Sequence, residues 1–563
     1  MMNKKEFDVV VVGAGAAGLM SAIVCARHGL DVLVIEKSDH IGGSAALSGG
    51  AIWAPGNAHS AAEGQIEDPE QVRLYLRENL GPHMDGPMVD AFLSYAPAAM
   101  DFLACHTSVK LQNRRYYPDY RSNLPGAALG GRVLEPLPFD GRQLGASFDL
   151  VRPPLAQFTL FGGMMINGAD INALLNAHRS LPLAWQAARL IGRYCKDRLT
   201  HERGTRLTIG NALVAGLLQT ALSMNIEIHR RTALEQLHVT NGRVDGLLCR
   251  SGGESLEFRA SRAVVLASGG FSADASMRQK YIPHAGSHYS LAASTNTGDG
   301  IRAALAIGAK VKDDYAGAAF LAPVSILQKE DGREELFPHL ISDRQKPGLI
   351  AVNEKGRRFV NEASSYHDFV LGMYRDSGGK PSVPAYLVCD SRFIRKYGLG
   401  FVKPRNLRLS RYVKAGYLYR GRSAQELAVS IGIDTANFEQ ALLDANRHAA
   451  DGKDPDFGKG STAYERLLGD IRHLPNPCLG TISKPPFYAV RVWPGDLGSA
   501  LGLETDTHSR VLDQARTPMP GLYACGADMH SVMSGTYPAA GITLGPALTF
   551  GFICGESILD DSK

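Results

Sequence analysis

The pattern of apolar and polar positions near the start of the sequence predicts a strand, a helix and a second strand. Residues 7–12 (FDVVVV) form a continuous apolar run that ends in glycine, which is typical of a strand buried in a parallel sheet. Residues 17–29 predict a helix, and residues 31–36 (DVLVIE) predict a second strand that ends in an acid. This order indicates the first βαβ unit of an α/β fold.

Further along the chain, the pattern predicts more strands of the same kind. The stretch from Ile226 to Leu266 is rich in strand signals, with a turn at Asn241-Gly242 and a final buried strand, AVVLAS. Residues 521–528 (GLYACGAD) repeat the form of a short apolar strand that ends in glycine, and a last helix is expected from about Gly545. We therefore predict a dinucleotide-binding domain over residues 1–314 and 486–563, and an inserted α+β catalytic domain over residues 315–485 that caps it.

Residues 150–206 look like an insertion in the first domain. In the stretch LPLAWQAARLIGRYCKDRL, helical periodicity puts Ala184, Ala188, Ile191 and Cys195 on one face, and basic residues outnumber the acidic one. Such a basic amphipathic helix either packs on the protein or contacts a membrane surface or a partner.

Composition narrows the class of protein. The 563 residues are 45% hydrophobic and 21% charged, as in ordinary globular enzymes. A net charge of +4 is too balanced for a protein whose main partner is nucleic acid. The eight cysteines form no CxxC pair, so no metal site is expected from them. Without a signal peptide or an apolar run of about 18 residues, we expect a cytoplasmic protein with no membrane-spanning helix.

Gly13, Gly15 and Gly18 form a GxGxxG motif directly after the first strand, and Glu36 ends the second strand. In this context the glycines permit a tight turn, close approach of a pyrophosphate, and packing of the helix on the strand. The helix N-terminus offers free N–H groups to phosphates, and Glu36 can accept hydrogen bonds from ribose hydroxyls. The motif therefore predicts a bound dinucleotide.

The residues after this motif favour FAD. A second Gly/Ser-rich stretch, IGGSAALSGG, occupies residues 41–50, and the segments NTGDG (296–300) and GRRFVNE (356–362) follow. This set resembles the flavoprotein superfamily of fumarate reductases and ketosteroid dehydrogenases. Members with covalent flavin carry a histidine where this chain has Ser44-Ala45-Ala46, so the FAD is expected to be non-covalent. The motifs and the resemblance together assign the cofactor to Gly13, Gly15, Ala16, Ala17, Gly18, Glu36, Lys37, Gly42, Gly43, Ser44, Ser48, Gly49, Gly50, Ala233, Ala267, Gly269, Asn296, Asp299, Gly526, Ala527, Ile542 and Leu544.

Three further motifs resemble 3-ketosteroid Δ1-dehydrogenases. They are YPDY (117–120), NEASSY (361–366) and YPAAG (537–541), although the last lacks the family's usual Gly-Pro and has Ala539-Ala540 instead. The resemblance implies that Tyr366 is the base, that Tyr120 assists it, and that the Tyr537 hydroxyl and the Gly541 N–H hold the ketone oxygen. Such donors stabilise the enolate that forms when a proton is removed beside a ketone. An ordinary tyrosine has a pKa near ~10, so the site must lower that pKa or remove the proton in concert with hydride transfer.

The expected partners are a 3-ketosteroid and an external electron acceptor such as a quinone. A 3-ketosteroid Δ4-(5α)-dehydrogenase stays open as an alternative, because it also acidifies a carbon beside the C3 ketone. Fumarate reductase chemistry is disfavoured, because Tyr366 replaces the family's arginine and the region 495–506 (GDLGSALGLETD) has no His or Arg to bind a dicarboxylate. A flavin-binding redox sensor without turnover is a fourth interpretation.

Overall fold

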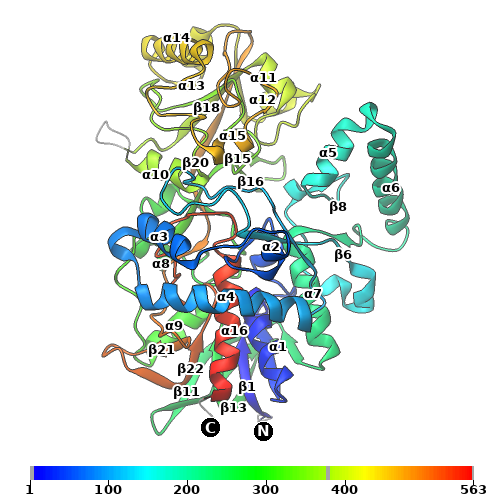
Figure 1. Ribbon diagram of the computed structural model, residues 1–563, viewed down its shortest axis with the longest axis vertical. Coiled ribbons are helices and arrows are strands. Elements are labelled where there is room, and N and C mark those ends of the chain that lie inside the picture. The colour runs from blue at the N-terminus through cyan, green and yellow to red at the C-terminus, as the bar shows by residue number, and fades with distance from the viewer. Residues whose placement is uncertain (1–4, 376–380, 561–563) are drawn as a thin grey trace.

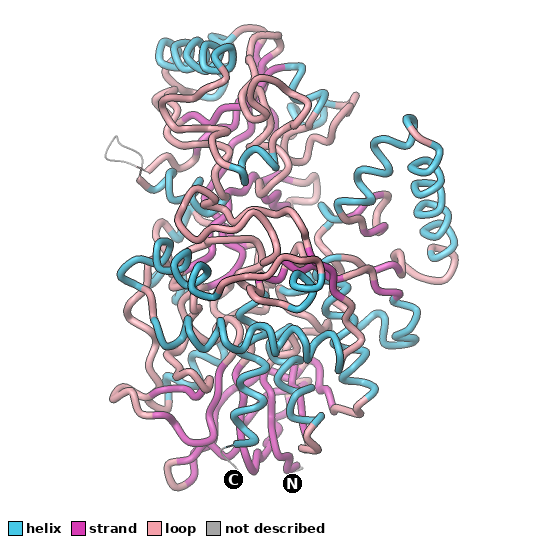
Figure 2. The backbone as a smooth tube through the Cα atoms, in the orientation of Figure 1, coloured by secondary structure: helices cyan, strands magenta, loops and turns pink. Residues whose placement is uncertain are grey.

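The computed structural model describes residues 5–375 and 381–560. Figure 1 shows two sheet-centred regions along the long axis, with both chain ends at the side of the first region. Figure 2 shows the strands gathered in these two regions, with long loop segments between them. The predicted α/β class is confirmed.

The first sheet has eight strands, and its parallel part contains the predicted βαβ unit. The order is β10-β2-β1-β13-β12-β11, with β22 beside β13 and β21 beside β22. In the turn between β11 and β12, Asn241 and Gly242 both have positive φ (50° and 77°), as the Asn-Gly signal predicts. The strands are β1 (Lys5–Val12), β2 (Val32–Glu36), β10 (Glu227–Arg230), β11 (Thr232–Thr240), β12 (Arg243–Ser251), β13 (Glu254–Leu266), β21 (Arg510–Leu512) and β22 (Pro518–Ala524).

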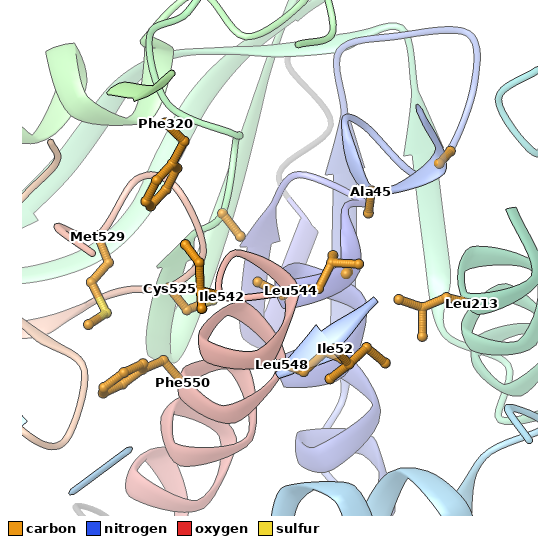
Figure 3. Close-up of a cluster of buried hydrophobic side chains, with 14 of the residues drawn as sticks. Ala45, Ile52, Leu213, Phe320, Cys525, Met529, Ile542, Leu544, Leu548 and Phe550 are labelled. Carbon is orange, nitrogen blue, oxygen red and sulfur yellow. The ribbon is translucent and has the colours of Figure 1, made fainter. Parts of the chain in front are cut away.

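Helices α1 (Ala16–Arg27), α7 (Ile209–Ser223) and α16 (Leu544–Asp560) are almost wholly buried beside this sheet. A Cβ atom at Gly551 of α16 would stand 2.6 Å from the Ala17 carbonyl oxygen, so the missing side chain lets α16 and α1 approach closely. Figure 3 shows Leu544 and Ile542 at the start of α16, near Ala45 from the second Gly/Ser stretch and Phe320 from the other sheet. The predicted cofactor segments therefore surround the start of this helix.

The second sheet has seven strands and order β16-β15-β20-β18-β17, with β14 and β19 also paired to β20. The predicted domain boundary at 485/486 assigned β20 to the first domain, yet sheet pairing joins this strand to the second sheet, because β14, β15, β18 and β19 all bond to it. The strands are β14 (Tyr289–Ser290), β15 (Ala319–Gln328), β16 (Glu334–Pro338), β17 (Leu349–Val352), β18 (Ala385–Asp390), β19 (Leu418–Gly421) and β20 (Phe487–Ser499); the helices are α10 (Tyr366–Tyr374), α11 (Ser391–Lys396), α12 (Leu409–Lys414), α13 (Ala424–Ile431), α14 (Thr435–Asp451) and α15 (Ala463–Leu468).

Between the two sheets lies a set of helices and short strands. Within the described residues, α4 (Gly86–His106) is long and apolar enough to cross a bilayer by length and composition alone. It packs against α16 with Phe92 and Leu103 buried, as a core helix does. The other elements are β3 (Ile52–Trp53), α2 (Ala58–Ala62), α3 (Pro69–Leu80), β4 (Leu111–Asn113), β5 (Val133–Pro136), β6 (Phe139–Asp140), β9 (Arg206–Leu207), α8 (Ala275–Tyr281) and α9 (Asp299–Ala306).

Residues 159–199 form an arm that stands away from the rest of the molecule (Figure 1). The arm contains β7 (Thr159–Leu160), β8 (Met164–Met165), α5 (Gly168–Asn176) and α6 (Leu181–Asp197). On α6 the buried residues are Ala187, Tyr194 and Asp197. The apolar face identified in the sequence is instead open, because Ala188, Ile191 and Cys195 are exposed.

Candidate functional site

The glycine turn between β1 and α1 is tightly packed at Gly13 and Gly18 but open at Gly15. A Cβ at Gly13, where φ is +110°, would stand 2.2 Å from the Ala267 carbonyl oxygen, and one at Gly18 would stand 2.0 Å from the Gly13 oxygen. A Cβ at Gly15 would meet nothing within 4 Å. Gly15 caps α1 without a side-chain hydrogen bond, so the first N–H groups of α1, including those of Ala16 and Ala17, face an open position that fits a pyrophosphate.

Glu36 is buried at the end of β2 with its carboxylate held in place. Its two oxygens accept hydrogen bonds from the backbone N–H groups of Ala14 (2.9 Å) and Ser38 (2.8 Å). Burial raises the pKa of this carboxyl group, although the two N–H donors oppose the shift. Each oxygen keeps a second lone pair, which fits the predicted contact with ribose hydroxyls.

Several of the other predicted cofactor residues form hydrogen bonds with one another. The Lys37 Nζ atom donates to Asp299 at 2.8 Å, and the Ser44 hydroxyl oxygen accepts from the Asn296 side chain at 3.0 Å. The Ser48 hydroxyl accepts from the Gly50 N–H at 3.1 Å. The turn residues with positive φ are Gly42, Gly43, Gly50, Gly269 and Gly526. Ala233 lies in β11, Ala267 follows β13, Ala527 follows Gly526, Gly49 precedes Gly50, and Ile542 and Leu544 lie at the start of α16.

Asp528 is a buried residue that the sequence did not single out. Its carboxylate accepts hydrogen bonds from the N–H groups of Ser268 (2.5 Å) and Gly270 (2.9 Å) and from the Ser268 hydroxyl (3.0 Å). It thereby joins the loop after β22 to the loop after β13. No local pattern marks this residue, because its partners are about 260 positions away.

Three predicted catalytic tyrosines come together from three separate segments. The Tyr120 hydroxyl donates to the Tyr366 oxygen at 3.0 Å. The Tyr366 and Tyr537 rings lie with centroids 4.9 Å apart at 74°, and the Tyr120 and Tyr537 rings stack at 5.7 Å. The Pro538 carbonyl accepts from the Tyr120 N–H at 2.9 Å and from the Tyr75 hydroxyl at 2.7 Å, so the YPDY and YPAAG segments are tied together.

Burial sets the acidity of these phenols. It raises the pKa of Tyr120 and of Tyr366 well above the ordinary value, and it raises the pKa of Tyr537 to about 12. The neighbouring Tyr537 also raises the pKa of Tyr366, whereas the hydrogen bond from Tyr120 lowers it. Of the two routes that the sequence leaves open, removal of the proton in concert with hydride transfer fits this environment better than a phenol that is ionised in advance.

Gly541 lies four residues after Tyr537 and packs against the backbone of Ala51 and Trp53. Its φ is +89°, and a Cβ would stand 2.6 Å from backbone atoms of Ala51 and Trp53, so only glycine fits. Its carbonyl oxygen accepts from the Trp53 N–H at 3.1 Å and from the Gly545 N–H at 2.9 Å. Within the described part of the chain its own N–H has no acceptor, which leaves it free to bind a ketone oxygen.

Tyr464, in α15, is a fourth buried tyrosine that the sequence did not predict. Its ring lies 4.5 Å from that of Tyr120. The hydroxyl is buried and has no hydrogen-bond partner among the described residues. Such an unsatisfied group suits contact with a ligand, but no motif around residue 464 could have indicated it.

A possible cation site lies apart from the tyrosines. His448, Asp454 and Asp456 offer ligand atoms within 4.8 Å of one another. Asp454 already binds both nitrogens of the Arg358 guanidinium, at 3.0 and 2.8 Å. This prior pairing of the carboxylate disfavours a metal ion there.

The fold and the open glycine turn define a dinucleotide-binding flavoprotein. A family model described as an FAD binding domain matches residues 8–544, and the chain belongs to this family, whose cofactor is FAD.

Relatives with known names extend the match over the whole chain. The chain is 38% identical to 4-oxocyclohex-2-ene-1-carboxylate 5-dehydrogenase of Sinomonas cyclohexanicum, over 98% of this chain and 93% of that one. It is 34% identical to 3-oxosteroid 1-dehydrogenase of Mycobacterium tuberculosis, over 100% of both. The crystal structure of 3-ketosteroid Δ1-dehydrogenase from Sterolibacterium denitrificans, in complex with 1,4-androstadiene-3,17-dione, aligns with a TM-score of 0.91 and 36% identity, covering 99% of this chain and 100% of that one.

Proposed function

We propose that this protein is an FAD-dependent 3-ketosteroid Δ1-dehydrogenase. The observation that carries the proposal is the hydrogen-bonded pair Tyr120–Tyr366, packed against Tyr537. Four residues after Tyr537, the Gly541 N–H lacks an acceptor within the described residues. The named steroid dehydrogenases, with 34% and 36% identity, support the same chemistry.

The residues divide the reaction between them. The Tyr537 hydroxyl and the Gly541 N–H bind the C3 ketone oxygen and stabilise the enolate that develops there. The Tyr366 oxygen takes the proton from C2. The electron pair of the broken C2–H bond becomes the second bond between C1 and C2, while the C1–H electron pair leaves with the hydride. Bound FAD supplies the two-electron acceptor for that hydride, and an external acceptor of the quinone class regenerates the oxidised cofactor.

A monocyclic ketone acid is the second candidate substrate, favoured by the 38% identity to a 4-oxocyclohex-2-ene-1-carboxylate 5-dehydrogenase. Its carboxylate would need a cation. Two arginines lie beside the tyrosines, but Arg121 is paired with Asp368 at 2.7 Å and the Arg344 side chain donates to backbone carbonyls. This arrangement favours a neutral ketone.

Anaerobic turnover of the purified protein decides between these substrates. We expect androst-4-ene-3,17-dione to bleach the flavin and to give the 1,4-diene, identified by mass and ultraviolet spectrum. Conversion of the 5α-reduced analogue to the 4-ene would show the Δ4-(5α) chemistry instead. Bleaching by 4-oxocyclohex-2-ene-1-carboxylate alone would show the monocyclic substrate, and no bleaching by any of them would overturn the proposal.

We also propose that the arm attaches the protein peripherally to the cytoplasmic surface of a membrane, from which a sterol would be taken. Leu181 and Leu199 are 86% and 83% exposed, and Trp185 is 73% exposed. On α6, Arg189 and Lys196 are exposed close to this apolar stripe. An apolar stripe flanked by basic residues is typical of helices that lie in the interface of an anionic membrane.

Co-sedimentation with vesicles tests the attachment. Replacing Leu181 and Trp185 together with Asp should abolish binding to vesicles that contain phosphatidylglycerol. The matched control is Leu407→Asp, because Leu407 is 97% exposed but lies outside the arm. Equal sedimentation of all three proteins, or none by the parent protein, would return the arm to a purely structural role.

A further inference from the structure

We propose that Arg344 is a positioning residue for the base: its buried positive charge and its hydrogen bonds prepare Tyr366 to accept the proton. The inference rests on the proposed function, because it takes Tyr366 to be the base. It adds a residue that none of the sequence motifs contains.

Arg344 holds the segment that leads to Tyr366. Its guanidinium donates to the carbonyl oxygens of Glu362 at 2.8 Å and of Ser364 at 3.3 Å. The guanidinium carbon also lies 4.9 Å from the ring centroid of Phe369, which is one turn beyond Tyr366 on α10. The guanidinium therefore contacts the chain on both sides of the base.

The charge of this guanidinium is buried without a direct ion pair, although the Asp343 and Glu362 carboxylates act on it from farther away. Arg344 is completely buried, and its remaining bonds go to the carbonyls of His339 (2.6 Å) and Leu340 (3.0 Å). Within residues 5–375 and 381–560, no carboxylate forms an ion pair with its side chain. Asp343, the next residue, bonds to the Arg344 main-chain N–H and to His339 instead. Carbonyl dipoles satisfy the donors but leave the net charge, which in a low-dielectric interior favours a nearby anion.

The other groups that face Tyr366 do not supply a positive charge. The phenols of Tyr120, Tyr464 and Tyr537 surround it, and none of them carries a positive charge. On its own helix, Asp368 is neutralised by Arg121.

His367, also on α10, accepts a hydrogen bond from the Leu321 N–H, and burial lowers its pKa to about 4, so it is neutral at pH 7. The free N–H groups at the start of α10 add a weaker positive potential of the same sign. Arg344 thus supplies a buried cation that interacts with Tyr366 as well as with Asp343 and Glu362, and its charge opposes the burial that disfavours a phenolate.

The pH dependence of anaerobic flavin reduction tests the inference. A positive charge favours the deprotonated base, so its removal should move the rising limb of the rate profile, where the base loses its proton, to higher pH. Arg344→Gln, which keeps hydrogen-bond donors but no charge, should shift that limb upward by about 1–2 pH units and slow reduction at pH 7 by ~10-fold or more. Arg344→Lys should keep the limb within about 0.5 unit of the parent value, because the charge remains.

A half-buried arginine outside the site provides the control. Arg203 stacks on Phe148 at 4.7 Å and donates to the Val151 carbonyl and the Asn211 side chain, a similar environment far from the tyrosines in the sequence. Arg203→Gln should leave the position of the limb unchanged. Folding of each variant is checked by its circular dichroism and bound flavin.

The outcomes separate the two proposals. If Arg344→Gln is folded and slower but has the parent pH profile, Arg344 is merely structural and the inference fails. If both Arg344 variants lose flavin or do not fold, the Tyr366 base is titrated in the parent enzyme instead, by following the charge-transfer absorbance of the steroid-bound protein against pH. A transition below pH 8 would uphold a compensating cation, and one above pH 10 would exclude it. If Tyr366→Phe reduces flavin at the parent rate, the assignment of the base, and with it the proposed mechanism, is wrong.

Discussion

The three tyrosines of the site have the same side chain but different hydrogen bonds, and these differences separate their roles. Tyr366 accepts from Tyr120, whereas Tyr537 shares the YPAAG motif with Gly541, whose N–H has no acceptor within the described residues. The sequence motifs YPDY, NEASSY and YPAAG were enough to identify all three tyrosines as candidate catalytic residues. Tyr464, Arg344 and Asp528 were not predictable, because their importance lies in burial and in contacts with residues distant in sequence.

Replacing Tyr366 with Phe removes the base but leaves the donors for the ketone oxygen. Steroid binding should survive, while flavin reduction in anaerobic stopped-flow measurements slows by ~100-fold or more, the scale of a lost general base. Tyr116→Phe is the control, because this tyrosine is 54% exposed and outside the cluster. A parent rate in Tyr366→Phe would make Tyr120 the next candidate.

Replacing Tyr537 with Phe removes one of two donors to the ketone oxygen. Flavin reduction should slow by ~100- to 1,000-fold, and ketone binding should weaken, as expected for a lost oxyanion-hole donor. Exchange of the α-proton of bound ketone with deuterium, followed by mass spectrometry, should slow in parallel. Normal exchange combined with slow reduction would instead assign Tyr537 to the hydride step.

At the scale of elements, the sequence predicted β1, β2 and β22 of the first sheet well because each contains a short continuous apolar run. It assigned β20 to the first domain, because the sequence of an apolar strand does not show which sheet the strand joins. In the structure β20 pairs with β14, β15, β18 and β19 in the second sheet. The sequence could not decide whether the apolar face of α6 is covered, because periodicity identifies an apolar face but not what packs on it.

Asp528 ties the loop after β22 to the loop after β13, and the loss of its hydrogen bonds should loosen the cofactor site. Asp528→Asn places an amide N–H₂ against backbone N–H groups that now have a carboxylate acceptor. We expect FAD affinity to fall by roughly 10- to 100-fold, the equivalent of ~1–3 kcal/mol for an unsatisfied buried group. Fluorescence titration of the apoprotein with FAD measures this. Asp90→Asn, at an exposed carboxylate, is the control, and equal affinities would remove Asp528 from cofactor binding.

At the scale of the whole molecule, one experiment tests whether the FAD is bound covalently. Ser44, Ala45 and Ala46 offer no histidine for a covalent bond, and the Ser44 oxygen already accepts two hydrogen bonds. Acid precipitation of the yellow protein should release all FAD into the supernatant. A yellow pellet would show covalent flavin and contradict the prediction made from this turn.

Acid should destabilise the whole fold through buried neutral histidines. Burial lowers the pKa of His530 to about 3, so the unfolded state binds a proton that the folded state refuses. Stability is therefore lost as the pH falls below the unfolded value near ~6.5, by ~2 kcal/mol at pH 5 for this residue. His530→Phe should show a smaller drop in melting temperature between pH 7.5 and pH 5, measured with excess FAD, than the parent protein. His508→Phe, at an exposed site, should drop as the parent does; equal drops in all three would exclude this cause.

The donor at Gly541 is part of the main chain, and this has a consequence for how the enzyme can change over time. A side-chain donor is lost by one substitution, but every residue except proline carries an N–H, so the chemical group cannot be mutated away. What can be lost is its position, because a Cβ at 541 would collide with Ala51 and Trp53. In a library that randomises positions 537–541 and is selected for steroid turnover, surviving clones should therefore keep glycine at 541 while accepting exchanges at Ala539 and Ala540, which carry no assigned role. Gly541 is therefore the position in this motif that tolerates no side chain, whereas at Tyr537 a particular side chain must be kept.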